Sequence, residues 1–112
     1  MSISFKGLGE NVITFKTSTA VAGQPVTVSA NDTVSKSAAG DSFCGVAVSV
    51  VDGCAAVQTN GFVELPYSGT APTVGYATLV ANGSGGIKTN TTGRNLLVVN
   101  VNTTKSTAVV ML

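Results

Sequence analysis

Short strand-like segments separated by turn residues are the feature that most constrains the fold of this chain. Segments rich in Val, Thr, Ile and Phe recur along its whole length, and none shows a sustained apolar 3.6-residue period with helix caps. We therefore expect an all-β fold, either a compact β-sandwich or a partly closed β-barrel, with about eight short and mostly antiparallel strands. The expected strands are residues 11–17, 25–29, 43–51, 55–59, 62–65, 74–80, 96–101 and 107–112.

The length of 112 residues suits one domain with one modest hydrophobic core. We expect a single β domain over residues 1–112, in which residues 1–17 form an extended N-terminal arm or an edge strand. The first residues, MSISFKGLGENV, lack the basic start, apolar run and small-residue cleavage site of a secretory signal, so we expect the mature chain to begin here.

The clearest local pattern is the pair Asp52-Gly53 between the strand-like runs GVAVSVV and CAAVQT. An Asp-Gly pair favours the type I′ turn that joins two strands of a hairpin. A second turn pair, Asn60-Gly61, leads into FVEL and predicts a three-stranded meander through Leu65, which Pro66 ends or marks as an edge. Connectors are expected at residues 36–42, 66–72 and 82–86.

A weaker pattern indicates an internal duplication. PVTVSAN, ending at Asn31, aligns with YATLVAN, ending at Asn82, and GDSFCGVAV from Gly40 aligns with GRNLLVVNV from Gly93. Chance similarity between Val/Thr-rich strands explains the match equally well. If the duplication is real, the domain contains two similar sheet units packed around one core.

Charge and composition narrow the classes of partner. Charged residues make up only 10% of the chain, against roughly 25% in ordinary soluble domains, so the surface is unusually neutral and self-assembly or docking is expected. The six Lys and Arg are scattered singly, which argues against nucleic acid. No apolar stretch approaches the ~18 residues of a membrane helix, so no membrane partner is expected.

The residues that carry chemistry do not assemble into a recognisable site. The chain has no His, which removes the commonest general base and the usual partner of a nucleophilic Ser or Cys. Two Cys without His cannot complete a zinc shell. The acids Asp32, Asp41 and Asp52 fall in turns, where side-chain to backbone hydrogen bonds are their expected role. We therefore predict no enzyme activity, no catalytic or metal-binding residues and no cofactor.

The hairpin register argues against a disulfide between Cys44 and Cys54. With Asp52-Gly53 as the loop, Cys44 lies opposite Gly61, seven rungs from Cys54, or ~23 Å at the usual rise per strand residue. A disulfide needs Cα atoms within ~7 Å. We predict two free thiols that act as apolar fillers of the sheet faces.

The order of these segments resembles a family of small β-rich proteins encoded in the head modules of tailed phages and prophages, the capsid decoration or head-associated proteins. The segments that carry the resemblance, in chain order, are GENVITFKTSTAVAGQPVTV, FCGVAVSVVDG, NGFVELP, GYATLVANGSGGIKT and STAVVML. The resemblance implies a virion structural protein, made in the bacterial host cytoplasm, that binds the outer capsid surface as a homotrimer. It also implies that the major capsid protein is the partner and that contacts between capsomers are reinforced.

The candidate partner-binding residues are Ile3, Phe5, Val12 and Phe15, in the extended segment 2–15. Apolar and polar residues alternate at its start, so we expect it to add a strand to a neighbour; an ordinary edge strand or a frayed end is an equal alternative. Two other function classes stay open. One is a carbohydrate-binding or adhesin-like β-sandwich, for which Tyr67 and Tyr76 would supply the aromatic contacts, and the other is a different structural component of a phage head or tail.

Overall fold

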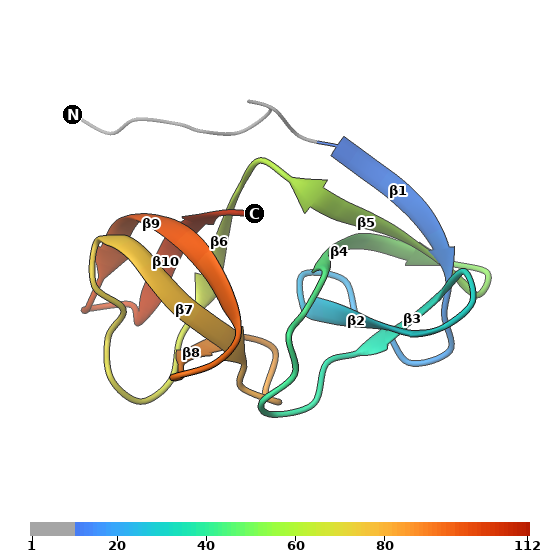
Figure 1. Cartoon of the computed structure of the whole chain (residues 1–112). Coiled ribbons are helices and arrows are strands. Elements are labelled where there is room, and N and C mark those ends of the chain that lie inside the picture. The colour runs from blue at the N-terminus through green and yellow to red at the C-terminus, as the bar shows by residue number, and fades with distance from the viewer. Residues whose placement is uncertain (1–10) are drawn as a thin grey trace.

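The computed structural model describes residues 11–112, which form ten strands and no helix (Figure 1). This confirms the predicted all-β class. The eight expected strands are present, and two short ones were not anticipated. In chain order the strands are β1 (Asn11–Lys16), β2 (Pro25–Ala30), β3 (Thr33–Lys36), β4 (Gly45–Val51), β5 (Cys54–Asn60), β6 (Phe62–Pro66), β7 (Gly75–Ala81), β8 (Ile87–Thr89), β9 (Arg94–Asn102) and β10 (Thr107–Met111).

The strands form two groups that lie side by side, here called the N-terminal half (residues 11–60) and the C-terminal half (residues 62–112) (Figure 1). The N-terminal half is a closed barrel with the order β1-β3-β2-β4-β5, in which only β1 and β3 run parallel, at Lys16 and Thr33. The C-terminal half is a five-stranded antiparallel sheet with the order β6-β10-β9-β7-β8.

The two halves share one topology. In each half the third strand pairs with the second, the second with the fourth, the fourth with the fifth, and the fifth with the first. The register agrees as well: Pro25 pairs with Val46, and Tyr76 pairs with Leu97, each 51 residues further along the chain. The parallel contact of Lys16 with Thr33 has its counterpart in a parallel bridge between Tyr67 and Ile87.

The β-bulges repeat in the same way. The ladder between β4 and β5 shifts between Ala47 and Ser49, and the ladder between β9 and β10 shifts at the corresponding rung, between Val109 and Val110. The structure therefore supports a two-fold internal repeat. It corrects one part of the predicted alignment, because Gly45 corresponds to Leu96 rather than to Val98. The two-residue error left each side chain on its proper face, since strand side chains alternate with a period of two.

The hairpin at Asp52-Gly53 is confirmed, and the meander beyond it is wrong. Asp52 and Gly53 both have positive φ, 51° and 76°, as a type I′ turn requires. After Gly61 the chain does not fold back on β5, because β4 and β1 already occupy both edges of β5. Instead, β6 crosses to the C-terminal half and pairs with β10, where it is an outer strand that ends at Pro66, as expected.

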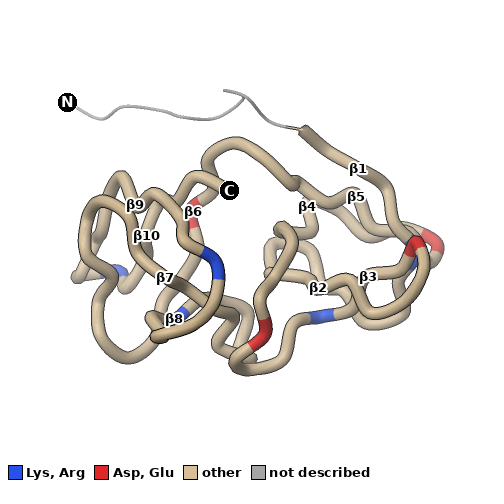
Figure 2. The backbone as a smooth tube through the Cα atoms, in the orientation of Figure 1, with Lys and Arg blue, Asp and Glu red and all other residues tan. Residues whose placement is uncertain are grey.

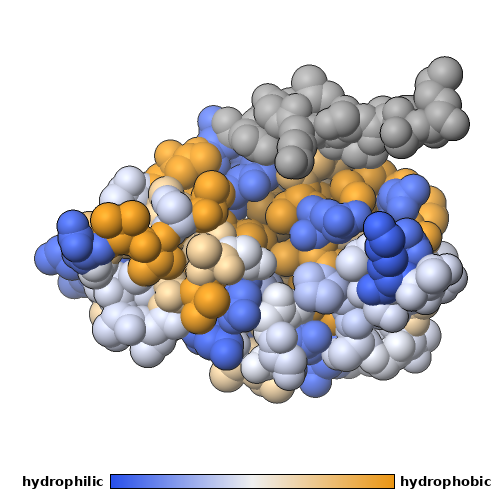
Figure 3. All heavy atoms as spheres, turned by 180° about the vertical axis from the view of Figure 1, so that it is seen from behind, coloured by the Kyte–Doolittle hydropathy of each residue, from blue (hydrophilic) through white to orange (hydrophobic). Residues whose placement is uncertain are grey.

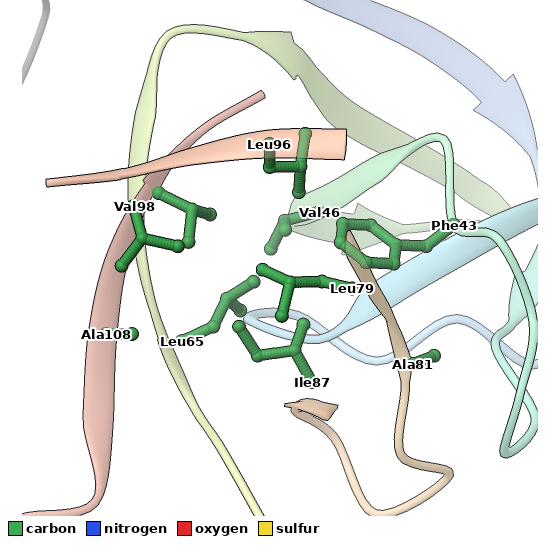
Figure 4. Packing of buried hydrophobic residues seen from close by; sticks show 10 residues of the cluster. Phe43, Val46, Leu65, Leu79, Ala81, Ile87, Leu96, Val98 and Ala108 are labelled. Carbon is green, nitrogen blue, oxygen red and sulfur yellow. The ribbon is translucent and has the colours of Figure 1, made fainter. Parts of the chain in front are cut away.

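Two apolar clusters, rather than the single core expected of a duplicated domain, fill the interior. The barrel cluster lies among β2 to β5, and the larger cluster lies in the C-terminal half (Figure 4). The larger cluster also takes Phe43 and Val46 from the N-terminal half, which point toward Leu79 and Leu96 (Figure 4). The barrel cluster consists of Val26, Val34, Ala47, Ala55 and Val57, and the larger one of Phe43, Val46, Leu65, Leu79, Ala81, Ile87, Leu96, Val98, Ala108 and Val110.

Backbone and amide hydrogen bonds join the halves at two further places. The buried Gln58 donates through Nε2 to the carbonyls of Asn60 and Phe62, at 3.0 and 3.1 Å, and so holds the crossing from β5 to β6. The connector before β4 runs along the end of β7, where Gly40 donates to the Ala81 carbonyl and Ala81 donates to the Asp41 carbonyl, each at 2.9 Å.

Candidate interaction surface

Strand β1 has one edge that no other described strand covers. Thr17 donates its N–H to the Gly53 carbonyl at 2.9 Å, on the β5 side, whereas Lys16 donates to the Asp32 carbonyl at 2.8 Å, on the opposite side. Because antiparallel ladders alternate, the N–H and C=O groups of Val12 and Thr14 also point away from β5. Within residues 11–112, β1 meets β3 at Lys16 alone, so these groups have no strand partner there.

The equivalent strand of the C-terminal half has features that oppose further pairing. Strand β6 carries Pro66, which has no N–H to donate, and the exposed carboxylate of Glu64. Proline and charge on an outer strand are common devices against edge-to-edge association. On β1 the charged Lys16 lies where the strand meets β3, and the part of the edge that stays open presents Val12 and Thr14, which are exposed and uncharged. Of the two equivalent edges, β1 is therefore the one suited to accept another strand.

The four predicted partner-binding residues have different outcomes. Ile3 and Phe5 lie outside the described residues. Val12 is 51% exposed and lies on the outer face of β1, in keeping with a contact role. Phe15 packs against the barrel cluster, so it anchors β1 to its own barrel rather than to a partner. Residues 11–16 form strand β1, which pairs with β5 along its length and with β3 at Lys16.

A second surface feature is a row of apolar side chains across the outer face of the C-terminal sheet. Residues directly opposite in a ladder share a face, and Tyr76, Leu97 and Met111 are successive partners on β7, β9 and β10. Tyr76 is 71% exposed and Met111 37%, while Leu97 is partly buried. We call Tyr76, Leu97 and Met111 the C-terminal row.

Seen from behind, apolar side chains reach the surface over both halves (Figure 3). The charged positions are few and both signs occur in each half, with two acidic positions close together at the end of the N-terminal half beside β3 (Figure 2). The sequence pattern identified Val12 but missed Thr14, Leu97 and Met111, because their grouping depends on which strands become neighbours. Only the alternation along each strand could have indicated that Leu97 faces outward.

The residues with metal-binding or reactive side chains are dispersed over the described chain. Within residues 11–112, no three His, Cys, Asp or Glu residues are grouped so that they could hold a metal ion. Asp41 accepts a hydrogen bond from the Ala38 N–H at 2.9 Å, the predicted turn role. Asp32 and Asp52 serve their turns through positive φ instead. The described part of the chain contains no helix that could cross a membrane.

Both thiols are free, as predicted, but only one of them is a packing group. Cys44 is half-buried against the barrel cluster and donates its backbone N–H to the Val26 carbonyl at 2.9 Å. Burial raises the pKa of the Cys44 thiol, and Arg94 opposes this shift in part. Cys54 is exposed beside the hairpin turn, so its predicted role as an apolar filler is wrong.

No protein-family model matches the chain, and no curated protein matches it.

Proposed function

We propose that this protein is a structural component of a phage virion, which binds the outer surface of the capsid and reinforces the contacts between capsomers. The observation that carries the proposal is the open part of the β1 edge, where Val12 and Thr14 are exposed and uncharged. The resemblance to head-associated proteins supplies the capsid as the partner.

The edge of β1 offers a specific mode of attachment. An extended segment of the major capsid protein would pair with β1 and satisfy the outward N–H and C=O groups of Val12 and Thr14, which is strand addition. The exposed Val12 side chain would add apolar contact. One such contact is weak, but a homo-oligomer, for which we propose a trimer, meets repeated sites on a capsid and gains affinity through avidity.

Co-sedimentation with empty capsids of the encoding phage tests the proposal. We expect the wild-type protein to pellet with capsids and the Val12→Pro variant to lose most of this binding, because proline removes the outward N–H without touching the bonds to β5. Val48→Ser is the matched control, since Val48 is similarly exposed but lies on β4, away from the β1 edge. It should pellet as the wild type does.

Two results would count against the proposal. Wild-type protein that stays in the supernatant with every capsid form would remove the capsid as partner. Undiminished pelleting of Val12→Pro would leave the capsid as partner but would exclude strand addition at β1.

A further inference from the structure

The internal repeat gives the two halves equivalent surfaces, but an equivalent surface is buried in one half and exposed in the other. The residues equivalent to the C-terminal row are Pro25, Val46 and Gln58, which are successive partners across the barrel and which we call the N-terminal row. Pro25, Val46 and Gln58 are buried, and Val46 belongs to the cluster of the C-terminal half. This N-terminal row is therefore part of the contact between the halves, whereas Tyr76, at the position of Pro25, is exposed.

At the ends of β2 and β7 the C-terminal half is the buried one and the N-terminal half is the exposed one. The last three residues of β7, Leu79 to Ala81, are buried: Leu79 and Ala81 belong to the cluster that contains Phe43, and the Ala81 backbone bonds the connector before β4. The equivalent residues of β2, which lie 51 positions earlier, are all exposed, and Val28 is 53% exposed. We call Val28, Ser29 and Ala30 the β2 end. Each of the two surfaces that meet between the halves thus has an equivalent surface elsewhere in the molecule. These equivalents are the C-terminal row and the β2 end, and both are uncovered in the described chain.

We propose that these two open surfaces bind each other between copies of this chain, so that the C-terminal row of one copy packs against the β2 end of the next. The internal contact is the template, because Val46 of the N-terminal row shares a buried cluster with Leu79 and Ala81 at the end of β7. The match has one difference. Arg94 is the residue equivalent to Phe43, and it stacks on the Phe43 ring of its own chain at 5.6 Å. The contact between copies would therefore lack the phenyl ring that the internal contact contains.

Such a contact is heterologous, since each copy contributes two different surfaces. Heterologous contacts close into a ring when the rotation between copies allows it, and otherwise grow into filaments. A ring of three would agree with the trimer proposed above. The inference concerns only contacts between copies and does not depend on binding to a capsid.

Light scattering after size exclusion, over a wide range of concentration, tests the inference on the full chain. We expect the wild type to associate and each of two single variants, Tyr76→Asp in the row and Val28→Asp at the β2 end, to weaken association about tenfold or more. Val48→Ser, exposed but outside both surfaces, should associate normally. Circular dichroism of each variant confirms that the β fold is kept.

Mixing the two aspartate variants gives the sharper result. Tyr76→Asp retains an intact β2 end and Val28→Asp retains an intact row, so the mixture should form a heterodimer at concentrations where each variant alone is monomeric. A monomeric wild type at every concentration would overturn the inference. Association that persists in both aspartate variants, or a mixture that stays monomeric while the wild type associates, would overturn it too.

Discussion

Cys44 and Cys54 show how the surroundings of a single residue decide its chemistry. Both are thiols of the same hairpin region, yet Cys44 lies half-buried beside the barrel cluster and Cys54 is exposed at the start of β5. Desolvation disfavours the charged thiolate of Cys44 and raises its pKa. Since the thiolate is the nucleophile, the two residues should differ in reactivity.

We predict that Cys54 is alkylated well before Cys44 when the folded protein is treated with iodoacetamide under mildly alkaline conditions. Mass spectrometry of digested samples over time measures both rates, and the unfolded protein in denaturant, where the two thiols should react alike, is the control. Faster labelling of Cys44 in the folded protein would contradict the prediction.

The raised pKa of Cys44 also determines how its contribution to folding stability changes with pH. A thiol whose pKa is higher in the folded chain than in the unfolded chain holds its proton more tightly when folded. The contribution of Cys44 to stability is therefore complete below the unfolded pKa and is lost as the pH rises through the folded pKa. Alkaline solution should weaken the fold at this position, and Cys44→Ala should reduce that part of the pH dependence.

At the scale of the elements, β1 has one edge bonded to β5 and one edge open. The N–H groups of successive residues point alternately toward β5 and toward the open edge, so proline should act differently at neighbouring positions. We predict that Ile13→Pro lowers the free energy of unfolding by about 3 kcal/mol, because it removes a ladder bond to β5, whereas Val12→Pro lowers it by less than about 1 kcal/mol. Urea denaturation followed by circular dichroism measures both.

Equal losses for the two variants would mean that the open edge has a partner. A stable Val12→Pro variant is also the condition for interpreting its loss of capsid binding, since an unfolded protein would fail to pellet for a trivial reason.

Much of the element pattern could be predicted from the sequence, because the long strands are Val-rich and the turns carry Gly, Asp and Asn. Strand β3 was missed because TVSK is short and polar, with only Val34 fully buried. The meander failed because the choice of β10 as the partner of β6 depends on residues more than forty positions away. The open edge of β1 could not be predicted for the same reason, since an edge is open or covered only after all strands have paired.

At the scale of the whole molecule, the contact between the halves makes each depend on the other. Phe43 and Val46 belong to the N-terminal half by chain position, but their side chains complete the cluster of the C-terminal half. Gln58, which is buried in β5, hydrogen-bonds the first residue of β6. Removing the N-terminal half would therefore expose the cluster that Phe43 and Val46 complete and would leave the Phe62 carbonyl without its Gln58 donor.

This dependence gives a prediction for cooperativity. Phe43 is fully buried, and Phe43→Ala should lower the free energy of unfolding by about 3–5 kcal/mol through lost contact and the cavity left behind. Because Phe43 joins the halves, native-state hydrogen exchange should show protection falling together in β4 and in β9. Val48→Ala, on the surface of β4, should change the free energy by no more than about 0.5 kcal/mol. A loss of protection confined to β7, β8 and β9 would instead show that the barrel is stable on its own, and the repeated topology would then describe two independently folding units.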